Sequence, residues 1–288
     1  MGGQCAKDAA VPARNNTLVT SLYLSARSVM ARAPFQEVVD GVWVVTPYFR
    51  PTQNERTFST PFLLINARRQ GCAYLPTSRT IPDPRNILGK SLEALISSEG
   101  QDTAVRIAAL DAAVASARRR VSAMQGVECE SLRISGSVRH KAEARSTLVA
   151  RECARLVPPG STAGLIGYSG QIEHELSTLF SIQSFDLDPQ IIGYNTPSGF
   201  TVRHGDEIYG CDQLSGLVAT AMTLVTETLD QLLDLAAAKG IPLIIYAQTG
   251  ANLGPLLVTA GVDTVIAEHI PFYNFEGSST ITVSRRRD

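Results

Sequence analysis

The sequence predicts an α/β protein in two parts, a smaller α+β domain over residues 1–125 and a parallel-sheet α/β domain over residues 138–288. Two observations predict this division. In the first part, strand-like runs rich in β-branched and aromatic residues come first and helical segments follow, which is typical of α+β units. In the second part, short apolar runs alternate strictly with helical segments, as in a doubly wound parallel sheet.

The first part begins with a helix that Asn15 or Asn16 can cap and that continues to about residue 33. Strand-like runs bounded by turn residues come next, and segments made largely of good helix formers follow them. The runs lie at 35–49, 57–67 and 71–78, and the helical segments at 88–98 and 102–121. The polar stretch GVECESLRISGS (126–137) is irregular and is interpreted as a connector.

The second part opens with a helix at 138–156, and the alternation starts after it. A long loop that contains Tyr194, Pro197, Gly199 and Tyr209 separates the second and third strands. The strands are expected at 162–167, 181–187, 216–222, 241–247 and 263–270, and the helices at 170–180, 225–239 and 252–260.

The stretch GLIGYSG (164–170) joins the first strand of this alternation to its helix. Its glycines recur at every third place, so the stretch is not the full G-x-G-x-x-G motif. Such a turn lets a backbone approach a ligand closely, and the helix N-terminus attracts negative groups. It is therefore either a cofactor-binding hinge, with Gly167, Tyr168, Ser169 and Gly170 in contact with the cofactor, or only a tight strand-to-helix turn.

The next strand ends at Asp186-Leu187-Asp188, and Asp186 lies 19 residues after Gly167 (186 − 167). In nucleoside-binding α/β folds, a carboxylate about 20 residues past the glycines accepts hydrogen bonds from ribose hydroxyls. Asp186 and Leu187 are therefore candidate cofactor contacts. The alternative is that Asp186 caps the following turn, which the sequence DLDPQ also suits.

S-adenosylmethionine is the predicted cofactor, because the loops offer little that suits the pyrophosphate of NAD. Its sulfonium would favour aromatic faces, which Tyr168, Tyr194, Phe200 and Tyr209 could supply. Methyl transfer and use of the aminocarboxypropyl arm, including ring closure of the donor to azetidine-2-carboxylate with loss of methylthioadenosine, stay open. The candidate catalytic residues are Tyr168, Asp188 and Tyr209, and Glu207 is a further carboxylate in these loops.

Several segments in order, from GKSLEALIS through GLIGYSG and FDLDP to LLVTAGVDTVIAEHI, resemble a two-domain bacterial family over residues 35–270. Its members pair an enolase-N-terminal-like domain with a Rossmann-like domain that carries a heavy-metal chelation label. The resemblance implies a pocket between the domains, at the carboxyl edge of the Rossmann-like sheet. The sequence departs from the family at TAMT (220–223) and AQTG (247–250), turns expected to face that pocket. Thr220, Ala221 and Thr223 are therefore further candidate cofactor contacts.

Composition excludes several classes of function. A net charge of −1 argues against a nucleic-acid or membrane-surface binder, and no apolar run approaches the length of a membrane helix. The N-terminus lacks a signal-peptide core, and the five scattered cysteines read as reduced thiols, so we expect a cytoplasmic protein. The expected partner is a small-molecule substrate, and a homodimer is a possible assembly.

Other chemistries have weak signals. The histidines show no metal-ligand spacing, and EHE (173–175) spreads its side chains around a helix, so no metal site is predicted. Ser169 lacks the second glycine of a nucleophile elbow, because Gln171 stands there. The alternative to S-adenosylmethionine chemistry is an accessory protein that handles a heavy-metal chelate, since a metal inside a chelate needs no ligand cluster from the chain.

Overall fold

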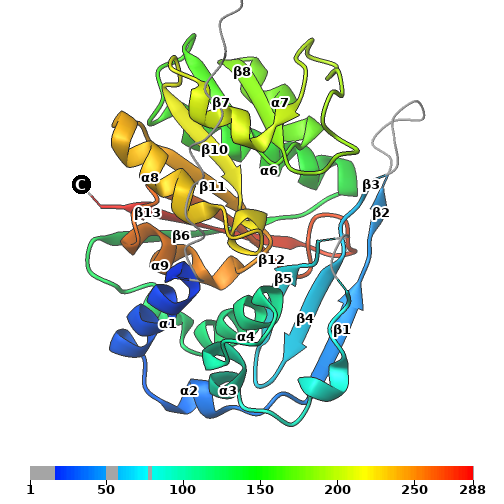
Figure 1. Ribbon diagram of the computed structural model, residues 1–288, viewed down its shortest axis with the longest axis vertical. Helices are drawn as coiled ribbons and strands as arrows, with labels where there is room; N and C mark the ends of the chain where they lie inside the picture. The colour runs from blue at the N-terminus through cyan, green and yellow to red at the C-terminus, as the bar shows by residue number, and fades with distance from the viewer. Residues whose placement is uncertain (1–16, 50–57, 77–79, 288) are drawn as a thin grey trace, which may run out of the picture.

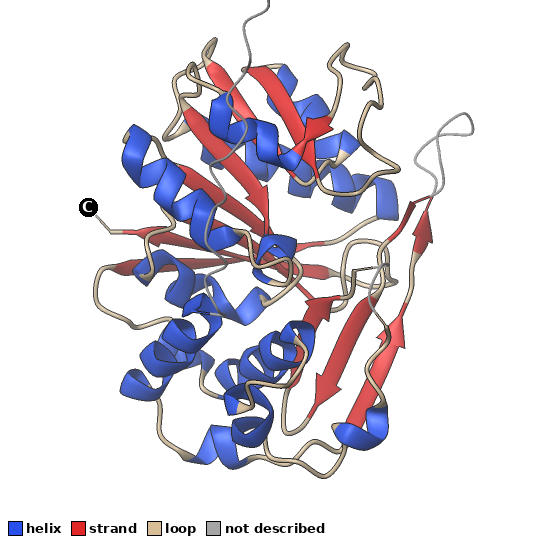
Figure 2. Ribbon diagram, in the orientation of Figure 1, coloured by secondary structure: helices blue, strands red, loops and turns tan. Residues whose placement is uncertain are grey.

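The computed structural model describes residues 17–49, 58–76 and 80–287 (Figure 1). Within them, a three-stranded antiparallel sheet of order β1-β4-β5 is separate from an eight-stranded sheet of order β6-β13-β12-β11-β10-β7-β8-β9. Helices accompany both sheets (Figure 2). The α/β class predicted from the sequence is confirmed. The expected cap at Asn15 or Asn16 and the expected strand ends at 57 and 77–78 lie outside the described residues.

The small unit, residues 17–121, packs its sheet against helix α4. Asp102 begins this helix by accepting a hydrogen bond from the Ala104 amide at 2.8 Å. A methyl group at Gly71 would lie only 2.0 Å from the Ala108 carbonyl oxygen, so glycine allows the close approach of β5 to α4. The elements are α1 (Thr17–Val29), α2 (Ala33–Gln36), β1 (Gly41–Val45), β2 (Tyr48–Phe49), β3 (Phe58–Ser59), β4 (Phe62–Asn66), β5 (Gln70–Tyr74), η1 (Pro84–Asn86), α3 (Leu92–Ser97), α4 (Thr103–Ser116) and α5 (Arg118–Val121).

The large unit, residues 127–287, is built on six parallel strands in the order β9-β8-β7-β10-β11-β12. This is the 3-2-1-4-5-6 order of the Rossmann fold, in which the order reverses between β7 and β10. The elements are β6 (Val127–Ile134), α6 (Val138–Ala154), β7 (Thr162–Ile166), α7 (Gly170–Ser177), β8 (Ser181–Asp186), β9 (Arg203–His204), η2 (Gly205–Gly210), β10 (Gly216–Thr220), η3 (Ala221–Leu224), α8 (Leu229–Lys239), β11 (Leu243–Ala247), η4 (Ala251–Leu253), α9 (Gly254–Thr259), β12 (Thr264–His269) and β13 (Ser279–Arg286).

Two strands of this sheet correct the sequence interpretation. Residues 126–137 were expected to be a connector, yet β6 occupies most of them, and β13 was not predicted at all. The two strands pair antiparallel at one edge, so the sheet is mostly parallel rather than wholly parallel. The physical reason is that β6 exposes much of its length to solvent, so it lacks the continuous apolar run of the buried strands.

Helices cover both faces of the large sheet. Val218 and Ile244 pack with side chains of α6 and α7, whereas their strand neighbours Leu217 and Leu243 pack with side chains of α8 and α9. The alternation follows from the two-residue period of a strand. No helix among the described residues has the length and apolar character needed to span a membrane.

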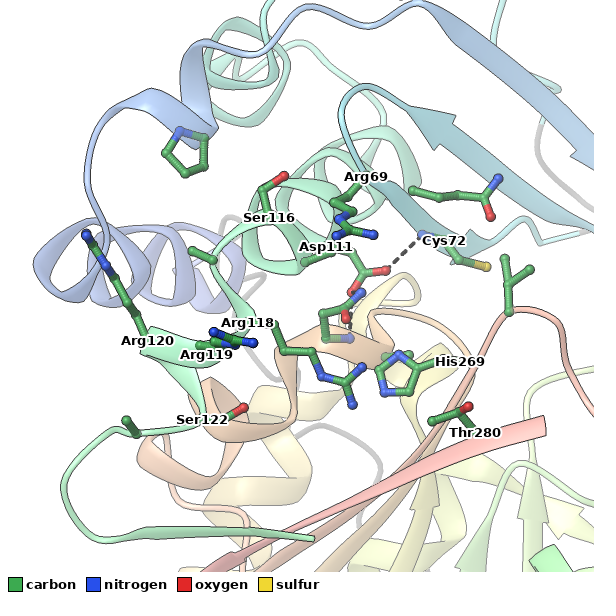
Figure 3. A pocket seen from close by; sticks show the side chains of 18 of the residues that line it. Arg69, Cys72, Asp111, Ser116, Arg118, Arg119, Arg120, Ser122, His269 and Thr280 are labelled. Atoms are coloured by element: carbon green, nitrogen blue, oxygen red, sulfur yellow. Dashed lines mark hydrogen bonds between the residues drawn. The ribbon is translucent and has the colours of Figure 1, made fainter. Parts of the chain in front are cut away.

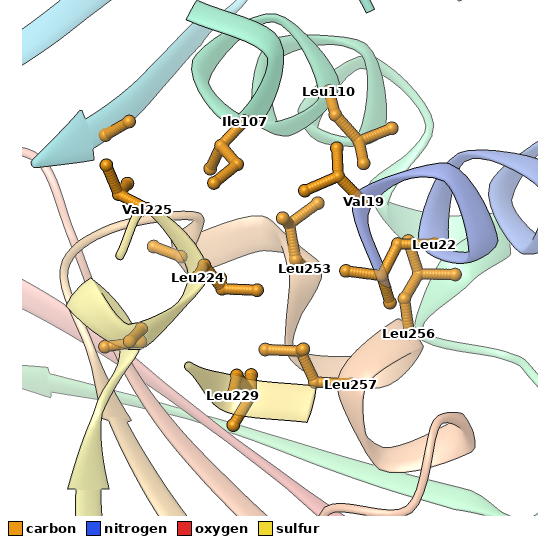
Figure 4. Packing of buried hydrophobic residues seen from close by; sticks show 14 of the residues in the cluster. Val19, Leu22, Ile107, Leu110, Leu224, Val225, Leu229, Leu253, Leu256 and Leu257 are labelled. Carbon is orange, nitrogen blue, oxygen red and sulfur yellow. The ribbon is translucent and has the colours of Figure 1, made fainter. Parts of the chain in front are cut away.

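The two units share one hydrophobic core. Figure 4 shows side chains of α1 and α4 meeting side chains of η3, η4, α8 and α9. Ile107 and Leu110 on α4 lie in the same buried cluster as Leu253 and Leu257 of the large unit. The junction is therefore fixed by apolar burial, and residues from both units can face a common cavity.

Candidate functional site

The predicted hinge follows β7 at the carboxyl edge of the large sheet. Gly167 has a φ of +81°, and a methyl group there would lie 2.3 Å from Thr220 Cγ2. The Tyr246 hydroxyl, at the end of β11, donates a hydrogen bond to the Gly167 carbonyl oxygen. The hinge is thus held by residues of β10 and β11, and Gly167 meets both a conformational and a steric requirement.

Asp186 lies at the end of β8, directly beside the hinge. Its Oδ2 accepts the Tyr168 amide hydrogen bond at 2.7 Å, and its Oδ1 accepts that of Asp188 at 2.9 Å. Burial raises the pKa of this carboxyl, and the backbone hydrogen bonds oppose that shift. Because a carboxylate has about four lone-pair sites and the Leu187 amide also donates to Asp186, about one acceptor position remains.

The aromatic residues divide between two places. The rings of Tyr168 and Tyr194 pack with centroids 5.6 Å apart, and both side chains are half-buried beside the hinge. Tyr209 instead donates to Gln231 Oε1 at 2.8 Å, so it lies against α8. Helix α8 covers one face of the large sheet, and α7, which follows the hinge, covers the opposite face. Burial, with the nearby Asp206 charge, raises the pKa of Tyr209.

The remaining candidates have local roles of their own. Thr220 caps η3, and the buried Thr223 hydroxyl donates to the Thr220 carbonyl oxygen at 2.7 Å. Ala221 is fully buried in the shared core. Leu187 and Asp188 are exposed, and the Glu207 carboxylate accepts the His204 amide hydrogen bond in a capping box. Ser169 precedes α7 without a side-chain capping bond, and Gly170 begins the helix.

Sequence reasoning missed several polar residues at the same edge. Glu268 of β12 is buried and accepts hydrogen bonds from Gln248 Nε2 at 2.8 Å and from Ser279 Oγ at 2.6 Å. The Arg145 guanidinium lies 3.6 Å from Glu268 and 4.3 Å from the centre of the Tyr273 ring. A tyrosine in LIIYA and a glutamate in TVIAEH, both otherwise apolar strands, were the available signals.

A cavity of about 1110 Å³ lies between the two units (Figure 3). The small unit contributes residues of β5, α4 and α5, and the large unit contributes Gln248, Asn252 and His269 near the carboxyl ends of β11 and β12. The AQTG turn therefore reaches this cavity through Gln248, whereas no residue of the TAMT turn lines it.

Burial shifts the pKa values of three side chains at the cavity. Asp111 is buried; its Oδ2 accepts the Cys72 amide hydrogen bond at 2.9 Å, and its Oδ1 accepts that of Asn252 at 2.7 Å. Burial raises the pKa of Asp111 to about 7 against these bonds, and it also raises the pKa of the Cys72 thiol. Burial and the Arg118 charge lower the pKa of His269 to about 3, so its imidazole is neutral at physiological pH.

The described part of the chain contains no group of three or more His, Cys, Asp or Glu side chains placed to hold a metal ion. The four cysteines that it contains are free thiols.

Comparison with known proteins gives a fold and no activity. No family model matches the sequence, and no curated protein does. A protein of unknown function from the DUF364 family of Desulfitobacterium hafniense DCB-2 matches 95% of this chain and 99% of its own, with a TM-score of 0.60 and 15% identity. A DUF364 protein of unknown function from Pyrococcus horikoshii matches 93% of this chain and 99% of its own, with a TM-score of 0.53 and 12% identity. The likeness covers both units and, at this identity, concerns the fold alone.

Proposed function

We propose that the protein is an S-adenosylmethionine-binding enzyme of small-molecule metabolism. The observation that carries the proposal is the position of Asp186 beside the Gly167 hinge, at the point where the strand order of the sheet reverses. In open α/β sheets, ligands bind outside the carboxyl ends of the strands at this reversal. The family resemblance adds two further parts to this proposal. The small unit is related to the N-terminal domain of enolases, and the family carries a heavy-metal chelation name.

The residues at the hinge fit the adenosine half of this ligand. The remaining acceptor position on the Asp186 carboxylate suits a ribose hydroxyl, and the tight turn at Gly167 brings backbone close to the sugar. The half-buried Tyr168 and Tyr194 rings offer faces to a sulfonium, which attracts aromatic faces through cation–π interaction. When bound, S-adenosylmethionine supplies either an electrophilic methyl group or an electrophilic aminocarboxypropyl carbon.

The chain's own contribution is to orient the donor and to move one proton. Tyr168 follows β7 and Asp188 follows β8, and both donate backbone amide hydrogen bonds to Asp186. Their side chains therefore start close to each other at the carboxyl edge of the sheet. The Asp188 carboxylate could accept the proton that the attacking group must lose, and Tyr168 could accept it only in the phenolate form. Tyr209 lies against α8 and is the weakest of the three catalytic candidates. Ring closure of the donor and transfer to a separate acceptor both remain compatible with this arrangement.

The first experiment is calorimetric titration of the full chain with S-adenosylmethionine, S-adenosylhomocysteine, methylthioadenosine and NAD. We expect the three adenosyl compounds to bind, and binding of NAD alone, or of none of them, would refute the proposal. Asp186→Asn should weaken adenosyl binding about ten- to hundredfold, because a hydrogen bond to a charged group is lost. Asp212→Asn is the control, since Asp212 is exposed beside Lys239 at the end of α8, toward the opposite sheet edge.

Asp186 also holds the hinge, so a second measurement separates binding from folding. The 2′,3′-dideoxy analogue of methylthioadenosine lacks the ribose hydroxyls, and the wild type should bind it more weakly than methylthioadenosine. Asp186→Asn should bind the two compounds about equally. If the variant still discriminates between them as strongly as the wild type, Asp186 does not contact the ribose.

Turnover separates the proposed enzyme from the alternative, an accessory protein for a heavy-metal chelate. Products are followed by chromatography after incubation with S-adenosylmethionine, alone and with candidate acceptors. Methylthioadenosine formed without an acceptor identifies rearrangement of the donor. S-adenosylhomocysteine formed only with an acceptor identifies methyl transfer. Tight binding of a metal chelate with neither product would favour the accessory protein.

A further inference from the structure

We propose that the cavity between the two units binds a small oxyanion with more than one negative charge, a compound with phosphate or several carboxylate groups. The cavity is lined by Arg69, Arg118, Arg119 and Arg120, and among the described residues of its lining Asp111 is the one that is acidic. Arg69 comes from the turn between β4 and β5, and the other arginines come from α5. The site uses none of the hinge residues, so it is independent of the proposed adenosyl site.

The charges of these arginines are not paired within the described part of the chain. No carboxylate there forms an ion pair with any of the four. Arg118 donates to the Ser131 hydroxyl at 3.3 Å and to the Thr282 hydroxyl, and both partners are neutral. Arg69, Arg119 and Arg120 are exposed, so water screens much of the repulsion between these charges, and a bound anion would neutralise the remainder.

Asp111 compensates this charge only in part: burial raises the pKa of its carboxyl to about 7, although the Arg118 charge lowers that pKa. Its two oxygens are turned to the Cys72 and Asn252 amides, and the Asn252 side chain donates a further bond at 3.1 Å. The Glu37 carboxylate accepts a bond from Ser116 at 2.9 Å but does not line the cavity. The cavity therefore presents excess positive charge beside a carboxyl that is already engaged.

The neutral groups around the arginines suit an oxyanion as well. His269 shares the Thr282 hydroxyl with Arg118, at 2.9 Å from its Nε2, and Arg118 extends toward the imidazole (Figure 3). Ser122 and Thr280 add hydroxyl groups to the lining. Arginine is the side chain best matched to the planar, two-oxygen geometry of carboxylate and phosphate. A cavity of about 1110 Å³ is large enough for a small metabolite.

The test uses the full chain at low salt, with inorganic pyrophosphate and citrate as separate calorimetric probes. The phosphate and carboxylate forms of the proposal differ in which probe binds more tightly. Arg69→Gln and Arg119→Gln should each weaken binding of the preferred probe about tenfold or more, since each removes one charge-assisted contact. Arg68→Gln is the matched control, because Arg68 is the exposed neighbour of Arg69 in the same turn and does not line the cavity.

Two results would overturn the proposal. One is the absence of saturable binding of both probes. The other is an equal loss of affinity in Arg68→Gln and Arg69→Gln, which would indicate general attraction to surface charge. Methylthioadenosine is titrated into the same variants, and its affinity should be unchanged. Failure of the anion site and failure of the adenosyl site are therefore seen separately.

Discussion

Tyr246, at the end of β11, donates its hydroxyl hydrogen to the carbonyl oxygen of Gly167, across the intervening strand β10. Burial, with the Asp186 charge, raises the pKa of Tyr246, so the hydroxyl keeps its proton throughout the physiological range. Thr220 of β10 fills the space beside the same glycine. The turn that was predicted to bind a cofactor is thus built from three strands rather than from its own sequence alone.

Tyr246→Phe removes the bond to the hinge carbonyl and leaves that part-buried acceptor without this donor. The free energy of unfolding should fall by about 1–3 kcal/mol. Urea denaturation followed by circular dichroism measures this change. Tyr209→Phe is the comparison, because its hydroxyl bond to Gln231 lies nearer the solvent and should contribute less. A loss in Tyr246→Phe no larger than in Tyr209→Phe would show that the hinge does not depend on the bond.

Gly167→Ala tests the fit of the hinge itself. Gly160, with a φ of +83°, is a matched control, since a methyl group there would have no neighbour within 4 Å, whereas at Gly167 it would meet Thr220 at 2.3 Å. Both substitutions carry the cost of a left-handed alanine, about 1–2 kcal/mol. Only Gly167→Ala adds a clash, so its melting temperature should be the lower of the two. Equal melting temperatures would mean that the Thr220 side chain moves aside freely.

The sequence was informative wherever local pattern and tertiary environment agree. Buried parallel strands such as LIIYA are continuous apolar runs, and the helices between them have apolar faces, so the alternation was visible without the structure. β6 was missed because its solvent-exposed residues break that pattern. The carboxyl end of β8 was also predictable, because parallel strands bring such ends to one edge.

The interdomain cavity was not predictable from residues, because its lining comes from segments that only tertiary packing brings together. Arg69 and Arg118 are 49 positions apart (118 − 69), and His269 belongs to the other unit. The sequence shows the run of arginines at 118–120 as the end of a helical segment, which is usually a solvated position. That the run faces a cavity follows only from the tertiary arrangement, which places Arg118 beside Thr282 of β13 and near His269.

Glu152→Gln tests the attachment of the antiparallel edge. Glu152 on α6 is buried and accepts bonds from Arg285 Nε at 2.8 Å and Nη2 at 3.0 Å, which hold β13 against the helix. Loss of one buried charge leaves its partner poorly compensated, so unfolding should become easier by up to about 3 kcal/mol. Glu143→Gln, on the same helix, breaks an exposed pair with Arg139 and should change stability by about 0.5 kcal/mol or less. Denaturation curves that show equal losses in the two variants would contradict this difference.

Because burial lowers the pKa of His269, this residue should make the folded protein less stable as the pH falls. Its folded-state pKa is lowered to about 3, whereas an unfolded histidine titrates near pH 6.5. Between these values the unfolded chain binds one more proton than the folded chain. The contribution of His269 is therefore fully present above about pH 6.5 and is lost by about 1.4 kcal/mol for each pH unit of acidification.

Asp111 acts in the opposite sense, because a carboxyl pKa raised to about 7 makes the folded chain bind the extra proton between about pH 4 and 7. In a plot of wild-type stability against pH, the contribution of Asp111 would therefore offset that of His269. We expect the free energy of unfolding of the wild type minus that of His269→Gln to fall steadily from pH 6.5 to pH 4, measured by urea denaturation at each pH. His174→Gln, which removes an exposed histidine of α7, should run parallel to the wild type. A flat difference curve for His269→Gln would show that the imidazole takes up a proton in the folded protein, and would require the Arg118 side chain to move away from it.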